Sequence, residues 1–570
     1  MKFAELVCRI QDFPRHLGQH SGGMVVFKGM LDQVVPLEPA SMDGRVILQW
    51  DKDDCAKVGI IKVDLLGLGM LAAVRDTINL VREHEGIELD MGTLPKDDPL
   101  VYQALQRADT VGMFQVESRA QMSSLPRTRP SRFYDIVVQV AIIRPGPIVG
   151  QMLGPYVKRR AGEEQVDYLD PILEPILRKT LGVPLFQEQL LRIAMVAADF
   201  TGGEAEELRR AFGFKRADKK VAEITERLVK GMEKKGISPE AREKIARAVN
   251  SFAIYGFPES HAASFAIITY ASAYLKCRHL PAFMVALLNN QPMGFYSPAT
   301  LIKDAERKGQ RFAPIDVQHS DIRCMLERDS DGFMIRMGLM YVRGLSRRTA
   351  SAMVITREQD GRFTSLSDLL KRVPCIDKRE VRALSMSGAL GDLDGSGKDR
   401  RASLWEAEAE MRPVGPLLKG IKNDKSESPL PLMTEIENIE ADFLSTGMTV
   451  DRHPMALVRG VLTRKGQFSS EGLRKAEPRA IITVSGAVIC RQRPGTAKGV
   501  LFISLEDEFG VANIIVMPDV YARYRRQITE SSYMTVKGIV EKNGDSALVK
   551  GLHFERMSFM TVYAESHDYH

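Results

Sequence analysis

The sequence lacks the features that mark secreted, zinc-binding and membrane-spanning proteins. Its 6 cysteines include no pair with the CxxC spacing, which argues against a zinc ribbon or a disulfide framework and fits a reducing cytosol. The N-terminal MKFAELVCRIQDFPRH has no apolar core followed by a small-residue cleavage site, so it is not a signal peptide. The longest nearly apolar run, VGIIKVDLLGLGMLAAV, contains Lys62 and Asp64 and is too short for a membrane helix. These absences predict a cytoplasmic protein with no membrane partner.

The composition is that of an ordinary soluble globular protein. Of the 570 residues, 44% are hydrophobic and 27% are charged, which supplies enough apolar side chains for real cores. A chain of this length exceeds the size at which one core keeps growing, so we expect about three or four domains. The 79 Lys and Arg residues against 73 Asp and Glu residues give a net charge of +6, which by itself does not establish a nucleic-acid partner.

Periodicity predicts a multidomain α+β protein. Residues 1–75 mix strand composition, in GMVVF and VGIIKV, with the helical spacing of LGMLAAVRDTINLVREH. Residues 76–330 are predominantly helical, and 331–395 contain two short helix pairs with a glycine at each tight connection. Residues 396–475 shift to the composition of a linker with a few helical turns. Residues 476–560 alternate as five or so short strands around the helical VYARYRRQI, the pattern of a small OB-type β-barrel.

Basic residues gather in clusters along the chain. One cluster alone is most often a solvated surface, but several at loop and helix ends, beside a candidate OB barrel, point to a long anionic polymer. The clusters are Lys158 to Arg160; Arg209, Arg210, Lys215, Arg216, Lys219 and Lys220; Arg343, Arg347 and Arg348; and Arg491, Arg493 and Lys498.

The segment YVRGLSRRTASAM places Gly344 directly before a predicted helix. A helix-hairpin-helix uses such a turn so that backbone N–H groups and the following helix N-terminus hold a phosphate without reading bases. Most glycine-containing turns between helices are only turns, so the position of this one before the linker and barrel is what favours the functional interpretation.

The pair His16 and His20 has the i, i+4 spacing of two zinc ligands on a helix. The glutamate of a metalloprotease motif is absent and Gly18 weakens the helix, so we favour polar contacts or phosphate binding for these histidines.

Lys62 and Asp64 stand two positions apart in the strand-like run GIIKVDLLGL. Such positions share one face of a strand, so an ammonium and a carboxylate would stand side by side. Lys62 could neutralise Asp64 or reach solvent at a sheet edge. Alternatively, the carboxylate could hold Mg²⁺ while the ammonium meets the phosphates that the metal also binds. The nearby DKDD at 51–54 has loop-like composition, which gives no reason for its carboxylates to converge with Asp64.

The longer motifs, taken in order, resemble those of the bacterial DNA polymerase III alpha family, most closely its error-prone, damage-tolerance branch. RHLGQHSGGMVV and WDKDDCAKVGIIKVDLLGLGML resemble the end of the palm, and GMFQVESRAQM, IIRPGPIVG, FQEQLLRIA, LRRAFGFK and YGFPESHAASFAIITYASAYLK resemble successive fingers motifs. GLMYVRGLS and LSMSGALGDL resemble the helix-hairpin-helix region. RQRPGTAKGVLFISLEDEFGVANIIVMPDV resembles the OB segment of the error-prone branch. The resemblance covers essentially the whole chain.

This resemblance implies a fold and a set of site residues. The expected domains are a partial polymerase-β-like palm, large α-helical fingers, the helix-hairpin-helix region, a connector and an OB-fold, at the ranges given above. Asp64 matches the third metal-binding aspartate of the palm, and Lys62 matches a lysine that meets the triphosphate of the incoming nucleotide. The expected nucleotide-binding residues of the fingers are Arg144, Arg209, Arg210 and His261. The expected DNA-binding residues are Arg343, Gly344, Arg347, Arg348, Arg491, Arg493 and Lys498.

The implied activity is DNA-directed DNA polymerisation of the error-prone, damage-tolerance type. In the family mechanism the primer 3′-hydroxyl attacks the α-phosphate of a dNTP while two Mg²⁺ ions stabilise the attacking and leaving oxygens. The implied partners are primer-template DNA, single-stranded DNA, which the barrel would hold by stacking and backbone charge, and dNTPs. Accessory damage-tolerance proteins and, indirectly, the sliding clamp are expected on the same basis.

One motif of the family does not occur in these 570 residues. The family carries its first two catalytic aspartates in a PDxDxDF-type motif, preceded by a PHP domain. We therefore expect an N-terminally incomplete polymerase that binds DNA without extending it, because one carboxylate cannot position two Mg²⁺ ions. The alternatives are a noncatalytic DNA-binding or scaffold subunit and one half of a split polymerase. An RNA-directed role also stays open, since an OB fold alone does not select the sugar.

Overall fold

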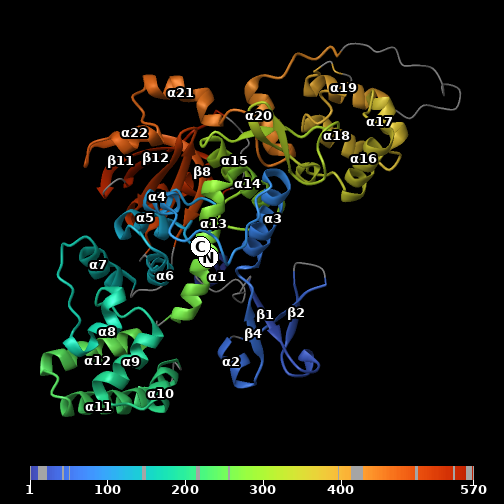
Figure 1. Ribbon diagram of the computed structural model, residues 1–570. Helices are drawn as coiled ribbons and strands as arrows, with labels where there is room; N and C mark the ends of the chain where they lie inside the picture. Colours follow the sequence, from blue (N-terminus) through green and yellow to red (C-terminus); the bar gives the residue numbers. More distant parts are fainter. Residues whose placement is uncertain are drawn as a thin grey trace. The chain divides into compact units, whose positions relative to one another are not determined.

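The computed structural model divides the chain into two compact units, Met1–Leu71 and Ala72–His570 (Figure 1). The structure describes residues 2–10, 22–40, 44–50, 52–143, 149–213, 218–253, 257–393, 395, 397–411, 428–493, 499–543, 546–559, 566 and 568. In these ranges no helix combines the length and the apolar character needed to cross a membrane.

The first unit consists of short elements around a small core. Its elements are α1 (Lys2–Ile10), β1 (Gly23–Val26), η1 (Leu31–Gln33), β2 (Leu37–Pro39), β3 (Val46–Leu48), α2 (Lys52–Lys57), β4 (Ile61–Asp64) and the start of α3 (Leu68–Glu85). β1 and β4 form one two-stranded antiparallel sheet, and β2 and β3 form another. Val35, Cys55 and Ile60 form the buried core of this unit. The strands predicted in GMVVF and VGIIKV and the helix that follows are confirmed.

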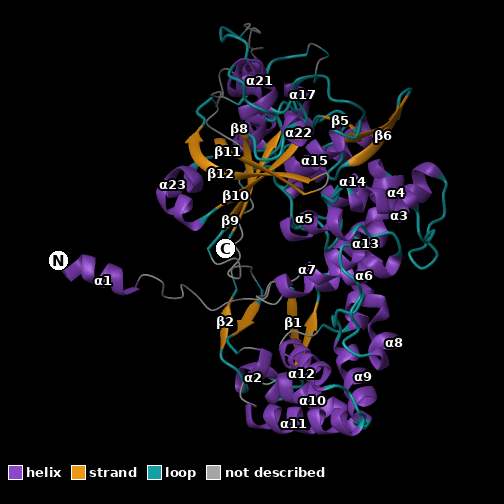
Figure 2. Cartoon of the chain, turned by 90° about the vertical axis from the view of Figure 1, so that its left-hand side faces the viewer, coloured by secondary structure: helices purple, strands orange, loops and turns teal. Residues whose placement is uncertain are grey.

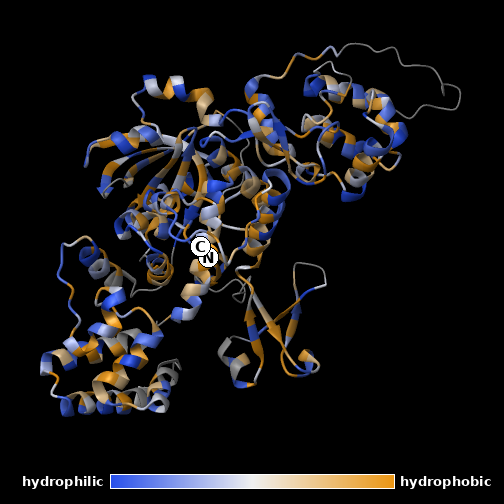
Figure 3. Cartoon of the chain, viewed as in Figure 1, coloured by the Kyte–Doolittle hydropathy of each residue, from blue (hydrophilic) through white to orange (hydrophobic). Residues whose placement is uncertain are grey.

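One face of the β1–β4 sheet is apolar and open to solvent in the described unit. Met24 lies opposite Val63 and Val26 lies opposite Ile61, so the four side chains share this face. They are 57%, 39%, 53% and 63% exposed, respectively. Figure 3 shows the apolar character of these strands. A two-stranded sheet with one uncovered apolar face has little stability of its own.

The second unit begins with a long helical region. After α3 come α4 (Pro99–Gln106), α5 (Arg119–Thr128), α6 (Phe133–Ile142), α7 (Val149–Arg160), η2 (Pro171–Leu173), α8 (Glu174–Leu177), η3 (Arg178–Thr180), α9 (Gln187–Ala198), α10 (Gly202–Gly213), α11 (Asp218–Lys234), α12 (Pro239–Ala253), α13 (Glu259–Arg278), α14 (Leu280–Asn289) and α15 (Pro298–Glu306). The central helix α13 packs against α4, α6 and α14. The helical character predicted for 76–330 is confirmed, apart from β5 (Arg311–Ala313) and β6 (Met325–Asp329), which the prediction missed.

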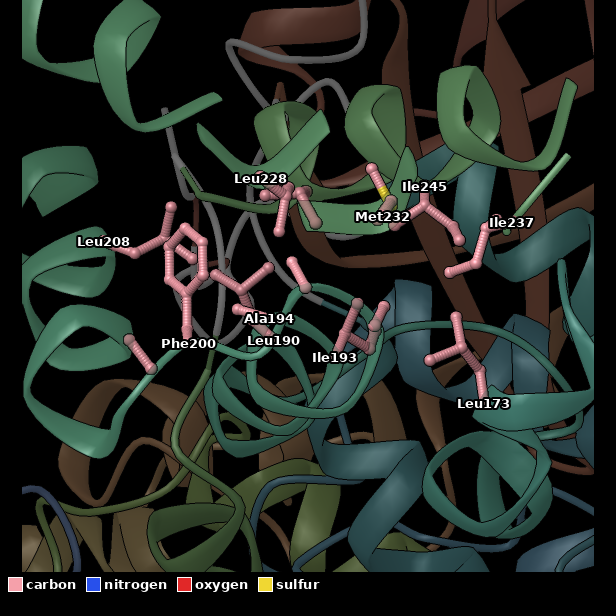
Figure 4. Packing of buried hydrophobic residues seen from close by; sticks show 14 of the residues in the cluster. Leu173, Leu190, Ile193, Ala194, Phe200, Leu208, Leu228, Met232, Ile237 and Ile245 are labelled. Carbon is pink, nitrogen blue, oxygen red and sulfur yellow. The ribbon is translucent and has the colours of Figure 1, made fainter. Parts of the chain in front are cut away.

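Helices α9 to α12 enclose a core of their own (Figure 4). Leu190 and Ile193 of α9 pack with Leu228 and Met232 of α11, all four being almost fully buried. The apolar positions recur at three- and four-residue spacing, which places them on one face of each helix. Helices α10 and α12 close the core from the other sides.

The middle of the second unit joins a small sheet to several short helices. The strands β5, β7 (Gly332–Arg336) and β6 form a three-stranded sheet in the order β5-β7-β6. The helices are η4 (Leu339–Tyr341), α16 (Arg347–Asp360), α17 (Leu366–Arg372), α18 (Lys378–Met386), α19 (Arg400–Glu410), α20 (Glu435–Ser445), α21 (Pro454–Arg464) and α22 (Ser470–Lys475). The part of the predicted connector that the structure describes is therefore largely helical.

The C-terminal region is a closed five-stranded barrel, shown with its strands in orange in Figure 2. Its elements are β8 (Ile481–Gln492), β9 (Leu501–Asp507), β10 (Gly510–Val516), α23 (Pro518–Glu530), β11 (Tyr533–Asn543) and β12 (Ser546–Arg556). The strand order is β10-β12-β11-β8-β9, closed by the parallel pair β10 and β12. The predicted barrel and the helix in VYARYRRQI are confirmed. The fold class is therefore mixed α+β, as predicted.

Candidate nucleic-acid and nucleotide sites

Strand β4 carries Lys62 and Asp64 in the first unit. In the register with β1, Lys62 pairs with Val25 and Asp64 with Gly23, so strand positions 62 and 64 share a face, as predicted. Lys62 is exposed, while the side chain of Asp64 is outside the described set. Nowhere among the described residues do three or more His, Cys, Asp or Glu side chains gather as a metal site would require.

The other candidate groups of the first unit give no metal ligand set. His16 and His20 lie outside the described residues. The DKDD segment, expected to be a loop, lies mostly in α2, which is a correction. Asp54 contacts Lys57 one helical turn later, at 3.4 Å, and both side chains are exposed. A surface pair of this kind contributes little stability and leaves the carboxylate in water.

His261 belongs to a row of aromatic rings along α13. It is the third residue of that helix and is partly exposed. Its ring centroid lies 4.9 Å from that of Phe257 and 4.2 Å from that of Phe265. Phe265 in turn meets the edge of Phe114 at 5.2 Å. A partly exposed row of rings has the chemistry for stacking on a nucleic-acid base.

The arginines predicted for the fingers are only partly described. Arg144 lies outside the described residues. Arg209 and Arg210 lie in the second half of α10, and their side chains are not described. Two carboxylates that sequence reasoning missed lie at the N-terminus of α13: Glu188 accepts from the backbone N–H of Glu259 at 2.8 Å, and Glu259 accepts from Tyr134 Oη at 2.7 Å. Glutamate in a first helical turn is the signal that could have found Glu259.

Two buried titratable side chains, Glu117 and Lys276, hold the loop that carries the fingers motif GMFQVES. Glu117 accepts from the backbone N–H groups of Gly112 at 2.9 Å and Phe295 at 3.0 Å. Burial raises the pKa of Glu117 to about 7, although these two donors oppose the shift. Lys276 Nζ donates to Val111 O at 2.7 Å and to Asp304 at 2.8 Å. Sequence reasoning missed this cluster, because its partners are far apart along the chain.

Lys276 belongs to a shared charge cluster. Burial acts to raise the pKa of Asp304, but Lys276 and Lys308 outweigh it and lower the pKa to about 2. Both lysines also contact Asp109, at 3.5 Å and 2.8 Å. The cluster therefore ties α13 and α15 to the loop after α4, and its charges are neutralised internally.

The predicted helix-hairpin-helix turn is present between η4 and α16. Gly344 has a φ of +89°, a left-handed conformation that favours glycine and permits the tight connection. Ser346 caps α16 by accepting from the backbone N–H of Thr349 at 3.2 Å. Arg347 and Arg348 follow in the first helical turn and are exposed. Exposed arginines in the first turn of a helix have the chemistry of a phosphate contact.

Arg343 also has an internal structural contact. Its backbone N–H donates to Ser445 O at 2.7 Å, and its guanidinium reaches Phe443 O at 3.4 Å. Both carbonyls lie at the C-terminal end of α20, where a cation is stabilised by the helix dipole.

Glu380 joins the Gly344 turn to the second helix pair, α17 and α18. Its carboxylate accepts from Ser346 N and Thr349 Oγ1, both at 2.9 Å, and from Asp377 N at 3.0 Å. Burial alone would raise the pKa of Glu380, but these donors, the backbone N–H groups first among them, lower it. Glu380 therefore holds the two turns together as an ionised carboxylate. Sequence reasoning missed this role.

The two predicted DNA contacts Arg491 and Arg493 have different surroundings in the barrel: Arg491 is buried and Arg493 is exposed. Arg491 is 8% exposed, and its guanidinium donates to Ile528 O at 2.7 Å and Ser531 O at 2.5 Å. Its third nitrogen, Nη1, lies 3.2 Å from a carboxylate oxygen of Asp568. Arg491 therefore caps the C-terminal end of α23 from inside the protein, a role that differs from the predicted one.

Arg493 is exposed at the end of β8, and its guanidinium lies over the ring of Tyr521 at 4.9 Å from the centroid. Lys498 lies outside the described residues.

Family models match the chain in the order of its units. Residues 1–67 match the bacterial DNA polymerase III alpha NTPase domain, and 70–236 match the bacterial DNA polymerase III alpha subunit finger domain. Residues 309–403 match a helix-hairpin-helix motif.

Curated error-prone DNA polymerases align along nearly the whole chain. That of Anaeromyxobacter dehalogenans strain 2CP-C is 46% identical over 556 residues, covering 95% of this chain and 49% of the relative. Those of Methylococcus capsulatus and Pseudomonas fluorescens are 44% and 43% identical, covering 93% and 98% of this chain and 52% and 54% of the relatives. The chain belongs to the error-prone branch of the bacterial DNA polymerase III alpha family. It spans about half the length of the curated relatives that it matches.

Membership of the polymerase III alpha family confirms the recognition made from the sequence motifs. It also confirms the fingers and helix-hairpin-helix regions, although the predicted domain boundaries and site residues stay predictions. The predicted fingers extend to residue 330, whereas the finger-domain match covers 70–236. The segment expected to be palm is the one that matches the NTPase domain.

Proposed function

We propose that this chain works as part of an error-prone DNA polymerase, which adds dNTPs to a primer 3′-hydroxyl under the direction of a template. The observation that carries the proposal is the alignment with error-prone polymerases at 43% to 46% identity over 93% to 98% of the chain. This alignment runs through the strand of Lys62 and Asp64, the helix of His261, the Gly344 turn and the barrel. A cytoplasmic location, with DNA, dNTPs, accessory damage-tolerance proteins and indirectly the sliding clamp as partners, follows from the same proposal.

Within this proposal each unit has a separate task. Asp64 would supply one ligand to Mg²⁺, and the Lys62 ammonium would meet the triphosphate of the incoming dNTP. The fingers residues Arg144, Arg209, Arg210 and His261 would hold the nucleotide, by charge and by stacking. Arg347 and Arg348 would hold duplex phosphates beside the Gly344 turn. Mg²⁺ supplies Lewis-acid stabilisation of the reacting phosphate when it is bound.

We further propose that the chain alone binds primer-template DNA but does not extend the primer. The paired-aspartate motif of the family does not occur in the 570 residues, and one carboxylate does not position two Mg²⁺ ions. A second candidate is one half of a split polymerase that is completed by another polypeptide carrying the two aspartates. A noncatalytic DNA-binding subunit would bind DNA in the same way but would not be activated by such a polypeptide.

Magnesium-dependent primer extension by the purified chain tests these proposals, with and without a separately expressed segment carrying the paired-aspartate motif. Extension only in the mixture, abolished by Asp64→Asn, would support the split polymerase. Extension by the chain alone, abolished by the same variant, would show a complete metal site within these residues and overturn the proposed inactivity. Extension in neither case, with primer-template binding retained, would favour the noncatalytic alternative. Failure to bind DNA would contradict the polymerase proposal itself.

A further inference from the structure

Strand β9 carries polar side chains on the outside of the barrel, and these side chains are nevertheless buried. Leu501, Ile503 and Leu505 pack inside the barrel. Because side chains alternate along a strand, Ser504 and Glu506 lie on the outer face. They are nonetheless only 2% and 0% exposed. Residues from outside the barrel therefore cover this face.

The covering groups come from the helical region. The buried Arg119 of α5 donates to Ser504 Oγ through its guanidinium. Arg307, directly after α15, donates to Glu506 Oε1 at 2.5 Å and to Asp507 O at 3.2 Å. Glu506 is fully buried and Arg307 is partly buried, so separating the pair would leave the Glu506 carboxylate buried without its cation. These side-chain contacts dock the barrel against the helices.

Helix α21 and its N-terminal cap extend this docking surface to the end of β9. His453 Nε2 lies 4.0 Å from Glu506 Oε2, with both side chains almost fully buried. Arg459 contacts Asp507 at 3.0 Å and Glu508 at 2.5 Å, at the turn between β9 and β10. Three segments separated in sequence, namely α5, the end of α15 and α21 with its cap, therefore converge on one strand.

This location matters because OB barrels usually bind oligonucleotides on the face of their second and third strands. In this barrel these strands are β9 and β10. The outer face of β9 carries a carboxylate, Glu506, which repels phosphate, and the nearby Arg307 and Arg459 are already paired with carboxylates. Binding a DNA strand there would require the buried ion pair to separate, which is costly. The usual oligonucleotide face is therefore unsuitable in this chain.

Helix α23 offers a surface of the opposite character. In Figure 2 it lies on the side of the barrel away from α5 and α15. Arg523 and Arg525 are exposed and make no ion pair within the described part of the chain, whereas Arg526 pairs with Glu530 at 3.1 Å. The helix therefore carries cations that are available to phosphate.

Aromatic groups accompany these cations. Tyr521 and Tyr524 are half-buried where α23 meets the barrel. The exposed guanidinium of Arg493 lies over Tyr521, and the hydroxyl of Tyr524 lies 2.7 Å from Nδ1 of the exposed His553. Cations beside partly exposed rings are the combination that single-stranded DNA binders use for the backbone and the bases.

We infer that the outer face of β9 is an internal docking surface for the helical region, and that single-stranded DNA lies along α23, next to Arg493. This inference rests on the proposed function of the chain as a DNA polymerase segment. It adds Arg523 and Arg525 as backbone contacts and assigns the barrel face that DNA uses.

Fluorescence anisotropy with a labelled oligothymidylate of about 20 nucleotides tests the DNA path in the full chain. The variant Arg523→Gln/Arg525→Gln removes two exposed charges, so we expect about fivefold to twentyfold weaker binding at about 0.1 M salt. The slope of the logarithm of the binding constant against the logarithm of the salt concentration should become less steep by about 1.4. The matched control Arg474→Gln/Lys475→Gln removes two exposed charges from α22 and should change the affinity by less than about twofold. Equal effects of both variants, or no effect of the first, would overturn the inference.

Hydrogen exchange of the same complex tests the docking surface. We expect the amides of β9 to be protected in the free chain and to stay equally protected when the oligothymidylate binds. Loss of β9 protection on binding would mean that the barrel leaves the helices to expose this face, and would overturn the inference. If the parent chain does not bind the oligothymidylate but still binds primer-template DNA, this inference fails alone. If it binds neither, the proposed function fails as well.

Discussion

Glu117 is the residue whose titration should be most visible in the stability of the protein. Burial raises its pKa to about 7, from an ordinary value of 4.5. Between these values the unfolded chain releases a proton that the folded protein keeps, so folding becomes less favourable as the pH rises. The contribution of Glu117 to the free energy of unfolding is complete below about pH 4.5 and is lost as the pH rises through about 7. The free energy of unfolding falls by about 3 kcal/mol over this range.

Replacing Glu117 by Gln should remove this pH dependence. The amide offers only one oxygen to the N–H groups of Gly112 and Phe295, so we expect the variant to be less stable than the parent. Because the amide cannot ionise, the stability of the variant should also change less with pH. Thermal unfolding of parent and variant between pH 5 and 8 would measure the difference. Glu226→Gln, at an exposed pair with Lys230, is the control and should follow the parent. Parallel curves for parent and Glu117→Gln would contradict the prediction.

Among the helical elements, α9 and α11 approach closely at a glycine. A Cβ added at Gly231 of α11 would lie 2.5 Å from Ala198 O, at the end of α9. Alanine favours a helix over glycine by about 1 kcal/mol, but here the clash should dominate and destabilise the α9 to α12 core by about 1–3 kcal/mol. Gly460→Ala in α21, where the added Cβ meets nothing within 4 Å, should instead stabilise its helix. Circular dichroism during thermal unfolding distinguishes the two, and stabilisation by Gly231→Ala would show that the predicted clash does not form.

The paired turns of the helix-hairpin-helix region depend on Glu380. The variant Glu380→Gln turns one carboxylate oxygen into a donor facing other donors, which should cost about 1–3 kcal/mol locally and loosen the Gly344 turn. We expect the affinity for duplex DNA to fall by about threefold to tenfold while Arg347 and Arg348 remain in place. Anisotropy with a labelled duplex measures this, with the exposed Glu358→Gln of the same helix α16 as control. Unchanged binding by Glu380→Gln would show that its role is confined to packing.

At the scale of the whole molecule, Arg307 connects the helical region to the barrel. Its removal leaves Glu506 buried without its cation, a loss of about 3–5 kcal/mol. Unfolding of several domains is not two-state, so local hydrogen exchange is the appropriate measurement. Arg307→Ala should speed exchange in β9 by about 100-fold or more, whereas Arg526→Ala, which breaks an exposed pair, should change it by less than about twofold. If hydrogen exchange in β9 is unchanged in Arg307→Ala, the pair of Arg307 and Glu506 does not stabilise the contact between the barrel and the helices.

Much of the architecture followed from local patterns. Alternating apolar residues predicted the barrel strands, and helical spacing predicted α3 and the long helical region. The turn at Gly344 could be predicted because it requires a left-handed backbone, which glycine favours. Such a backbone conformation depends only on one residue and its neighbours. The short strands β5 and β6 and the helix α2 were missed, because elements of three to six residues carry too little periodicity.

The sequence by itself determined the family of this protein, the order of its regions and the positions of its basic clusters. Only the tertiary structure decided which of those charges are available: Arg491 is buried at the end of α23, whereas Arg493 two residues later is exposed. Likewise, Arg307 and Glu506 lie 199 residues apart and meet only because the barrel docks on α15. The physical reason is that a helix or a strand follows from neighbouring residues, whereas the burial and pairing of a charge depend on segments that only folding brings together.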